Sequence, residues 1–169
     1  MNKRLDQDFY KQSALTLAPL ILGKLLVRNI DGKTYRFRIT EIEIYYGEAD
    51  TACHAFKGKT ERTKVMYEAG GIAYVYLCYG IHYLLNVVTG PKDHPEAILI
   101  RGIENYTGPG RLTKALKIDK TLNGEDFLRS DKLWLEDDGF IAEYELSKRI
   151  GVDYAQIEDR DKLWRFVLK

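Results

Sequence analysis

The chain has few of the features that mark secreted, membrane-spanning or disordered proteins. It contains two cysteines and four prolines, and 26 lysines and arginines against 25 aspartates and glutamates leave a net charge of +1. Cys53 and Cys78 lie far apart and form no CxxC pair, which favours reduced thiols in a cytosolic protein over a disulfide framework. No apolar run is long enough for a membrane-spanning helix, and we see no signal peptide or low-complexity tract. Because the net charge is close to zero, overall charge would not attract nucleic acid, although a local basic patch could.

The composition is that of a globular protein, with 45% hydrophobic and 30% charged residues. A length of 169 residues predicts a single domain over residues 1–169. Thr16-Leu17-Ala18-Pro19 predicts a helix start with Pro19 in the first turn, and Gly23 is a suitable stop for that helix.

Alternating apolar residues and turn dipeptides predict two β-hairpins. Residues 24–30 and 33–45 are joined at Asp31-Gly32, and residues 72–78 and 83–88 are joined at Tyr79-Gly80. Further strands are predicted at 97–103 and 164–168. Gly108-Pro109-Gly110 is expected to open a short basic helix over 111–116. The predicted fold is therefore a single compact α+β domain with a curved, mainly antiparallel sheet and surrounding short helices.

The most informative stretch is Thr40 to His54, which places carboxylates, aromatic rings and an imidazole in one strand-to-loop segment. Side chains two apart on a strand point the same way, so Glu41, Glu43 and Tyr45 share a face opposite Ile42 and Ile44. Upstream apolar residues have the parity of Glu43, so the apolar phase changes sides near residue 40, which predicts a bulge or strong twist. Alternatively, this segment is a half-exposed edge strand in which Glu41 and Glu43 are solvated charges.

Two further features call for an explanation. Arg101 interrupts an apolar strand, and a buried guanidinium requires a carboxylate, for which Glu43 is the candidate; alternatively Arg101 reaches solvent at a strand end. Twelve tyrosines could serve ordinary packing or could stack on a base or sugar. Tyr79 directly precedes Gly80 at a hairpin tip, where an exposed ring could wedge between base pairs.

Other types of chemistry find little support. The three histidines show no zinc-ligand spacing, and no serine-nucleophile or Walker-type motif is present, so we expect no metal site and neither covalent serine chemistry nor nucleotide hydrolysis. A local basic cluster comprises Lys57, Lys59, Arg62 and Lys64. Together with the Gly108-Pro109-Gly110 turn, it could contact phosphates, although basic loops are usually only solvated.

Taken together, these blocks resemble the alkyladenine DNA glycosylases, also called 3-methyladenine or methylpurine DNA glycosylases. The order and spacing match over most of the chain. The blocks that carry the resemblance are Glu41-Ile42-Glu43-Ile44-Tyr45-Tyr46-Gly47 with His54, Tyr74 to Gly80 with Asn86, Ile98-Leu99-Ile100-Arg101, and Gly108-Pro109-Gly110-Arg111-Leu112.

The resemblance implies a compact, bacterial-type, monofunctional enzyme that flips alkylated or deaminated purines out of double-stranded DNA and hydrolyses the N-glycosidic bond. It implies no cofactor, no metal and no membrane partner, a monomer, and a location in the bacterial cytoplasm at the nucleoid. By position, Glu43 resembles the base that activates water, and Arg101 the residue that helps to hold that water or the flipped nucleotide. The other implied roles are base binding by Tyr45, His54, Tyr76 and Asn86, intercalation by Tyr79, and DNA-backbone contact by Arg62, Lys64, Gly110 and Arg111.

Two other classes of protein remain open from the residues alone. A non-catalytic nucleic-acid-binding module would use the tyrosines for stacking and the Glu43–Arg101 pair for structure. A carbohydrate hydrolase would use Glu41 and Glu43 as an acid and base pair, although neighbours on one strand lie on the same side of a substrate and do not flank the bond.

Overall fold

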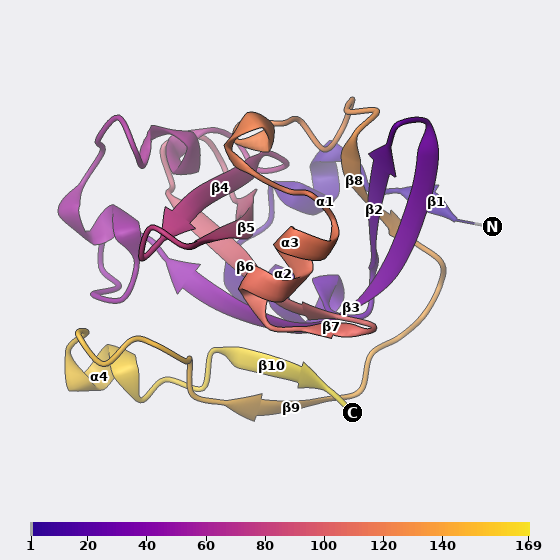
Figure 1. The fold of residues 1–169 in the computed structure, drawn as a ribbon. Coiled ribbons are helices and arrows are strands. Elements are labelled where there is room, and N and C mark those ends of the chain that lie inside the picture. Colours follow the sequence, from indigo (N-terminus) through magenta and orange to yellow (C-terminus); the bar gives the residue numbers. More distant parts are fainter. Residues whose placement is uncertain (1) are drawn as a thin grey trace.

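The computed structural model describes residues 2–169. Its strands are β1 (Lys3–Arg4), β2 (Leu25–Ile30), β3 (Lys33–Tyr46), β4 (Ala73–Cys78), β5 (His82–Thr89), β6 (Glu96–Ile103), β7 (Tyr106–Thr107), β8 (Leu133–Asp137), β9 (Tyr144–Ser147) and β10 (Arg165–Leu168) (Figure 1). The helices are α1 (Gln7–Tyr10), α2 (Ala14–Ile21), α3 (Pro109–Ala115) and α4 (Ile157–Arg160), with 3-10 turns at η1 (His54–Lys57), η2 (Lys64–Tyr67) and η3 (Lys120–Leu122).

The strands pair antiparallel in one sheet, in the order β1-β8-β2-β3-β6-β5-β4. The long strand β3 holds this sheet together, because its first part pairs with β2 and its second part pairs with β6 and β10. Strand β9 in turn pairs with β10, and β7 with the end of β6. The architecture confirms the predicted α+β fold with a mainly antiparallel sheet.

Both predicted hairpins are present. Asp31 and Gly32, with φ of 51° and 83°, connect β2 to β3, and Tyr79 and Gly80, with φ of 52° and 66°, lie at the tip between β4 and β5. Left-handed backbone at both turn residues suits the twist of two-residue hairpin loops. Tyr79 therefore adopts a conformation that a bulky residue rarely adopts, which directs its ring away from the sheet.

The predicted start of the first apolar helix is wrong. Helix α2 begins at Ala14, because Ser13 caps it by accepting a hydrogen bond from the Leu15 N–H, so Pro19 lies inside the helix and not in its first turn. The predicted stop is confirmed: Gly23 has a φ of 87°, and its N–H donates to the Ile39 carbonyl at 2.9 Å. This bond joins the end of α2 to β3.

The predicted irregularity near residue 40 is a shift in the pairing of β3 with β6 on both sides of Glu41. Before it, Ile39 faces the main core; after it, Ile42 and Ile44 do so. Glu43 and Tyr45 are thereby turned to the opposite face of the sheet. Leu17 and Ile21 of α2 pack into the same core, as do Leu112 of α3 and Leu116 directly after it.

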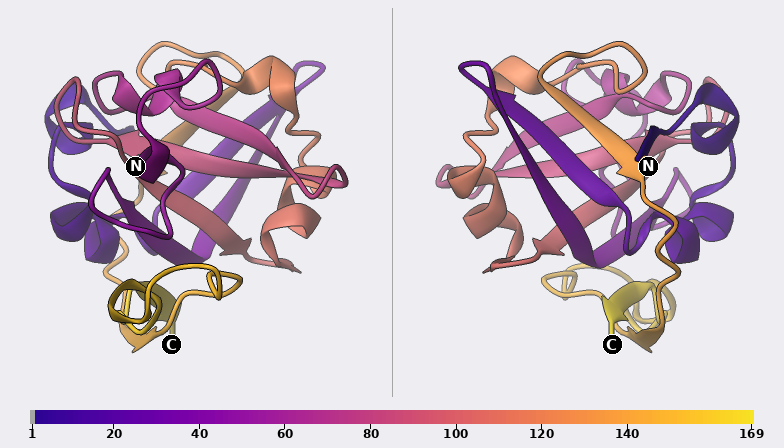
Figure 2. Two further views of the ribbon diagram at one scale, coloured as in Figure 1. Left: turned by 90° about the vertical axis from the view of Figure 1, so that its left-hand side faces the viewer. Right: turned by 90° about the vertical axis from the view of Figure 1, so that its right-hand side faces the viewer.

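The C-terminal segment, from β9 to β10, packs against the second part of β3 through the pairing of β10 with β3. Figure 2 shows β9, α4 and β10 below the other strands, with α1 and α2 on one side of the strands and α3 on the other. Residues 148–156, between β9 and α4, run along the end of β3 and so approach Glu43. Across residues 2–169, we find no helix that has the length and apolar character to span a membrane.

Candidate active site

A cavity of about 1090 Å³ opens on the face of the sheet that carries Tyr45. Its floor follows from strand register: Glu43 pairs with Leu99, Leu99 with Asn86, and Asn86 with Tyr74, so one row crosses four strands. The lining includes most residues that the sequence singled out, namely Tyr45, His54, Arg62, Tyr76, Tyr79, Asn86, Arg101, Gly110 and Arg111. Glu43 lies in the floor beneath this lining, and Lys64 lies outside it.

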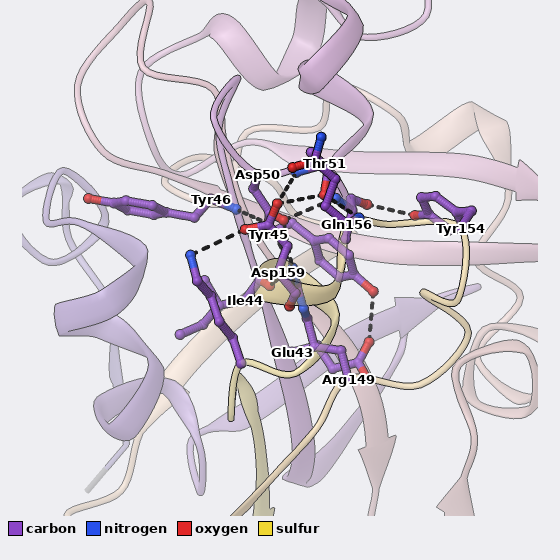
Figure 3. Close-up of polar contacts among 12 residues, drawn as sticks. Glu43, Ile44, Tyr45, Tyr46, Asp50, Thr51, Arg149, Tyr154, Gln156 and Asp159 are labelled. Carbon is purple, nitrogen blue, oxygen red and sulfur yellow. Dashed lines mark hydrogen bonds and ion pairs between the residues drawn. The ribbon is translucent and has the colours of Figure 1, made fainter.

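Glu43 has no exposed surface, yet polar groups meet both of its carboxylate oxygens. The Tyr45 hydroxyl donates to Oε1 at 2.8 Å (Figure 3), and the Ile150 N–H donates to Oε2 at 2.6 Å. Burial raises the pKa of Glu43, while Arg101 and these two hydrogen bonds act in the opposite direction. The result is a carboxylate that is fixed in orientation and more basic than an ordinary glutamate.

The predicted pairing of Arg101 with Glu43 is confirmed, with 3.5 Å between Nη1 and Oε1. The Arg101 side chain is only 14% exposed, so the alternative of an arginine reaching solvent is excluded. Its Nε is buried without a hydrogen-bond partner among the described residues, 4.0 Å from Oε1 of Glu41. Arg101 thus lies between two carboxylates and retains donor capacity for a further group.

Glu41 is not arranged as the second carboxylate of a glycan hydrolase. Arg165 Nη1 lies 2.6 Å from Glu41 Oε1, and Glu41 shares Arg101 with Glu43. Both carboxylates therefore sit beside the same guanidinium and do not flank a substrate bond, which argues against the carbohydrate-hydrolase reading.

Aromatic rings form the walls of the cavity. The rings of His54 and Tyr76 meet with their centroids 4.4 Å apart and their planes at 69°, and Nδ1 of His54 lies 3.0 Å from the Tyr74 hydroxyl. Burial, assisted by the charges of Arg62 and Lys57, lowers the pKa of His54 to about 4. The imidazole is therefore neutral near neutral pH and adds no charge of its own to this wall of the cavity.

Asn86 is buried in the floor, where its Nδ2 donates to the Tyr74 carbonyl at 3.2 Å. This bond fixes the amide within the sheet and holds it in the row that contains Glu43. A side chain so constrained cannot easily move to admit a larger ligand.

The mouth of the cavity combines exposed rings and cations. Tyr79 is 88% exposed at the hairpin tip, and the guanidinium of Arg62 lies over the Tyr76 ring, 5.4 Å from its centroid. Arg111 is exposed, whereas Lys64 pairs with Glu61 at 2.9 Å away from the lining. Gly110 packs so closely on His82 that an added Cβ would lie 2.8 Å from its ring.

Sequence reasoning missed the contribution of the C-terminal segment. Ile150, Gly151, Tyr154 and Gln156 line the cavity, and the Ile150 N–H reaches Glu43. No local motif marks these residues, because their role depends on a contact across 107 positions of sequence. Arg149, whose side chain is buried, lies directly before Ile150, but its burial cannot be predicted from the local sequence.

Residues 2–169 contain no group of three or more histidine, cysteine or acidic side chains arranged to hold a metal ion. Cys53 and Cys78 are both free thiols, which confirms the prediction of no disulfide. Burial raises the pKa of Cys53 to about 11, so this thiol is not an activated nucleophile.

Comparison with known proteins gives a consistent result. The profile of a family described as methylpurine-DNA glycosylase matches residues 8–107 and 105–169. A protein of Borrelia garinii subsp. bavariensis is 46% identical over 178 residues, covering 98% of this chain and 96% of its own. Proteins of Natranaerobius thermophilus and Clostridium perfringens are 40% and 42% identical over 190 and 197 residues, with the same coverage. All three bear the name "Putative 3-methyladenine DNA glycosylase".

Proposed function

Because the chain belongs to the methylpurine-DNA glycosylase family, we propose that it releases alkylated or deaminated purines from double-stranded DNA with a water activated by Glu43. Membership makes the protein a DNA glycosylase, a hydrolase that acts on N-glycosidic bonds in base-excision repair. The observation that carries the proposal is the buried Glu43–Arg101 pair in the floor of an aromatic cavity.

In the proposed reaction, the Glu43 carboxylate removes a proton from water as the water oxygen bonds to C1′ of the deoxyribose. The bond from C1′ to the purine nitrogen breaks, and its electron pair leaves with the base. Arg101 orients the water or the flipped nucleotide from its place beside Glu43. The raised pKa of Glu43 suits this role, because a base is most effective when its pKa approaches the working pH.

A purine inside a duplex cannot reach Glu43, so the nucleotide has to be extruded from the stack. The extruded purine lies between Tyr45 and the wall formed by His54 and Tyr76. A cationic alkylpurine gains from tyrosine faces, and the neutral His54 spares it a repulsion between like charges. Asn86, held rigidly in the floor, discriminates against the exocyclic amino group of normal guanine.

The exposed residues at the mouth supply the DNA contacts in this proposal. Tyr79 fills the gap that the extruded nucleotide leaves, since it is exposed at a hairpin tip. The phosphate contacts are assigned to Arg62, Lys64, Gly110 and Arg111. Lys64 would have to leave Glu61, so it is the weakest of the four assignments. We expect the enzyme to act as a monomer on the DNA of a bacterial cytoplasm.

We further propose that the enzyme has no lyase activity. A lyase needs an amine that can form a Schiff base with the sugar. Within residues 2–169, the cationic groups in contact with Glu43 and Glu41 are the guanidinium groups of Arg101 and Arg165, which are not nucleophiles. The cavity lining also includes a lysine, Lys57, but it is exposed on η1 and forms an ion pair with neither carboxylate. The abasic product should therefore remain as an intact strand.

The test measures release of free base from duplex DNA that carries methylated purines or a single hypoxanthine or ethenoadenine. We expect the wild type to release the base and to leave sites that break only after alkali. Glu43→Gln should slow release by about 10²–10⁴-fold. Glu158→Gln, which changes an exposed glutamate on α4, is the matched control and should retain full activity.

Other outcomes would contradict the proposal. A folded wild type that binds duplex DNA but releases none of these bases would indicate a binding module. Full activity of Glu43→Gln would remove Glu43 from its assigned role, and strand breaks without alkali would reveal a lyase.

A further inference from the structure

The segment between β9 and α4 is tied to the active site by a buried ion pair. Arg149 has a side chain with no exposed surface, and its two terminal nitrogens meet the Asp50 carboxylate at 2.7 and 3.1 Å. The same nitrogens donate to the carbonyls of Ile44 and Asp159 at 3.0 and 2.9 Å (Figure 3). One guanidinium thus joins β3, the loop after β3 and helix α4 of the C-terminal segment.

Asp50 is equally committed to the end of β3. Besides Arg149, its carboxylate accepts the N–H groups of Tyr46 and Ala52 at 2.9 and 3.0 Å. A second set of bonds runs parallel to this one, because the Tyr154 hydroxyl donates to the Ala52 carbonyl at 2.6 Å and the Gln156 N–H donates to Thr51 Oγ1 at 2.9 Å. The segment 149–156 is therefore attached to the loop 50–52 at several points.

Arg149 lies beside both groups that donate a hydrogen bond to the Glu43 carboxylate, the Ile150 N–H and the Tyr45 hydroxyl. Its neighbour Ile150 donates the backbone N–H to Glu43 Oε2 at 2.6 Å. Its guanidinium lies over the ring of Tyr45, 5.1 Å from the centroid, and the Tyr45 hydroxyl donates to Oε1 of the same carboxylate. Both protein hydrogen bonds to Glu43 thus depend on where Arg149 is held.

We infer that Arg149 and Asp50 are positioning residues of the glycosylase, which act through the Ile150 N–H and the Tyr45 ring to orient the Glu43 carboxylate. This inference rests on the proposed function of Glu43. A purely structural contact at this place would not need charge, because replacing a buried ion pair with packed apolar side chains is often neutral or stabilising. The pair lies where it can hold both hydrogen-bond donors to Glu43.

The charge balance around Glu43 gives the direction of the expected effect. Arg101 faces Glu43 from β6, Glu41 and Tyr45 lie beside it on β3, Arg165 is its cross-strand neighbour on β10, and Arg149 approaches from the segment 149–156. The Ile150 N–H and the Arg149 charge both lower the pKa of Glu43 against the effect of burial. Releasing them should raise this pKa, so that activity requires a higher pH.

The test is single-turnover excision of 7-methylguanine from a defined duplex between about pH 4.5 and pH 7. This lesion is cationic across the range, so an acid limb in the rate reports the enzyme and not the leaving base. For Arg149→Met, which removes the charge and the side chain that anchors the Ile150 N–H, we expect the limb to move up by about one pH unit and the maximal rate to fall about tenfold. Asp50→Asn, which leaves Arg149 charged but without its carboxylate partner, should also lower the maximal rate about tenfold. Asp153→Asn, exposed on the same segment, should match the wild type.

Further variants keep the test decisive. If Asp50→Asn fails to fold because Arg149 is left unpaired, the double variant Asp50→Asn with Arg149→Met removes both charges and should show the same shift. Folded Arg149→Met or double-variant protein with an unchanged acid limb would overturn the inference and leave the proposed function standing. A wild type without excision, or with an acid limb that does not depend on Glu43, would overturn both.

Discussion

His54 should make the stability of the fold depend on pH in a defined window. Its pKa is lowered from 6.5 to about 4, mainly by burial. Between these values the unfolded chain binds a proton at residue 54 that the folded chain does not bind, so stability falls as the pH falls. A shift of about 2.5 units corresponds to an upper limit of about 3.4 kcal/mol. Since the ring is partly exposed, we expect about 1–3 kcal/mol.

The variant His54→Phe isolates this contribution. Phenylalanine keeps an aromatic ring against Tyr76 but cannot titrate, and it leaves the Tyr74 hydroxyl without the Nδ1 partner. The lost contact should cost about 1–3 kcal/mol at every pH. The free energy of unfolding, measured by urea denaturation, should therefore favour the wild type at pH 7. This advantage should shrink by about 1–3 kcal/mol on acidification toward about pH 4.5.

Comparing the two proteins at each pH cancels the contributions of the other titrating groups. A difference in unfolding free energy that stays constant or grows on acidification would refute the reasoning, because His54 would then be able to accept a proton in the folded state. It would also mean that His54 can carry a positive charge beside a cationic purine.

Three other substitutions have outcomes that the contacts predict. Glu43→Gln should gain stability relative to the wild type as the pH rises from about 4.5 to 7, because a raised carboxyl pKa means that ionisation of Glu43 opposes folding in this window, whatever constant cost follows from the altered contact with Arg101. Tyr79→Ala should leave the unfolding free energy within about 0.5 kcal/mol, since the ring is 88% exposed, but should lower excision at subsaturating enzyme about tenfold. Gly110→Ala should cost about 1–3 kcal/mol, because its Cβ would lie 2.8 Å from the His82 ring, and adding His82→Ala should recover most of that loss in thermal unfolding.

Each of these outcomes has a clear opposite. A difference in unfolding free energy that moves in favour of the wild type as the pH rises would mean that ionisation of Glu43 stabilises the fold. Unchanged excision by Tyr79→Ala would remove the ring from the DNA contact, and a failure of His82→Ala to rescue Gly110→Ala would locate the strain elsewhere.

The sequence predicted the elements whose signals are local. The dipeptides Asp31-Gly32 and Tyr79-Gly80 specified both hairpins, because left-handed backbone at a two-residue loop has a strong sequence signature. The apolar phase change specified the irregularity in β3, and the interrupting arginine specified the ion pair with Glu43. The predicted start of helix α2 is wrong because proline is typical of the first turn of a helix, whereas here the Ser13 side chain caps the helix and Pro19 lies inside it.

The sequence could not predict which distant segment closes the site. The Ile150 N–H is a backbone group, and any residue except proline could supply it, so no residue type marks it. Arg149 and Asp50 are 99 positions apart, and Arg165 meets Glu41 across 124 positions. Such contacts depend on how the C-terminal segment with β9, α4 and β10 packs against β3, which the local sequence pattern does not encode.

The irregularity at Glu41 explains how one strand can serve both the core and the active site. Side chains alternate along a strand, so a strand without it would keep odd-numbered residues on the face of Ile39. Glu43 and Tyr45 would then point into the main core, and Ile42 and Ile44 would line the cavity. The shift in pairing exchanges the faces within three residues, and Gly102 accommodates it, because an added Cβ there would lie 3.0 Å from the Thr40 hydroxyl. The same strand can therefore be anchored by its apolar residues while it presents a carboxylate, and the position of Glu43 is as rigid as the core beneath it.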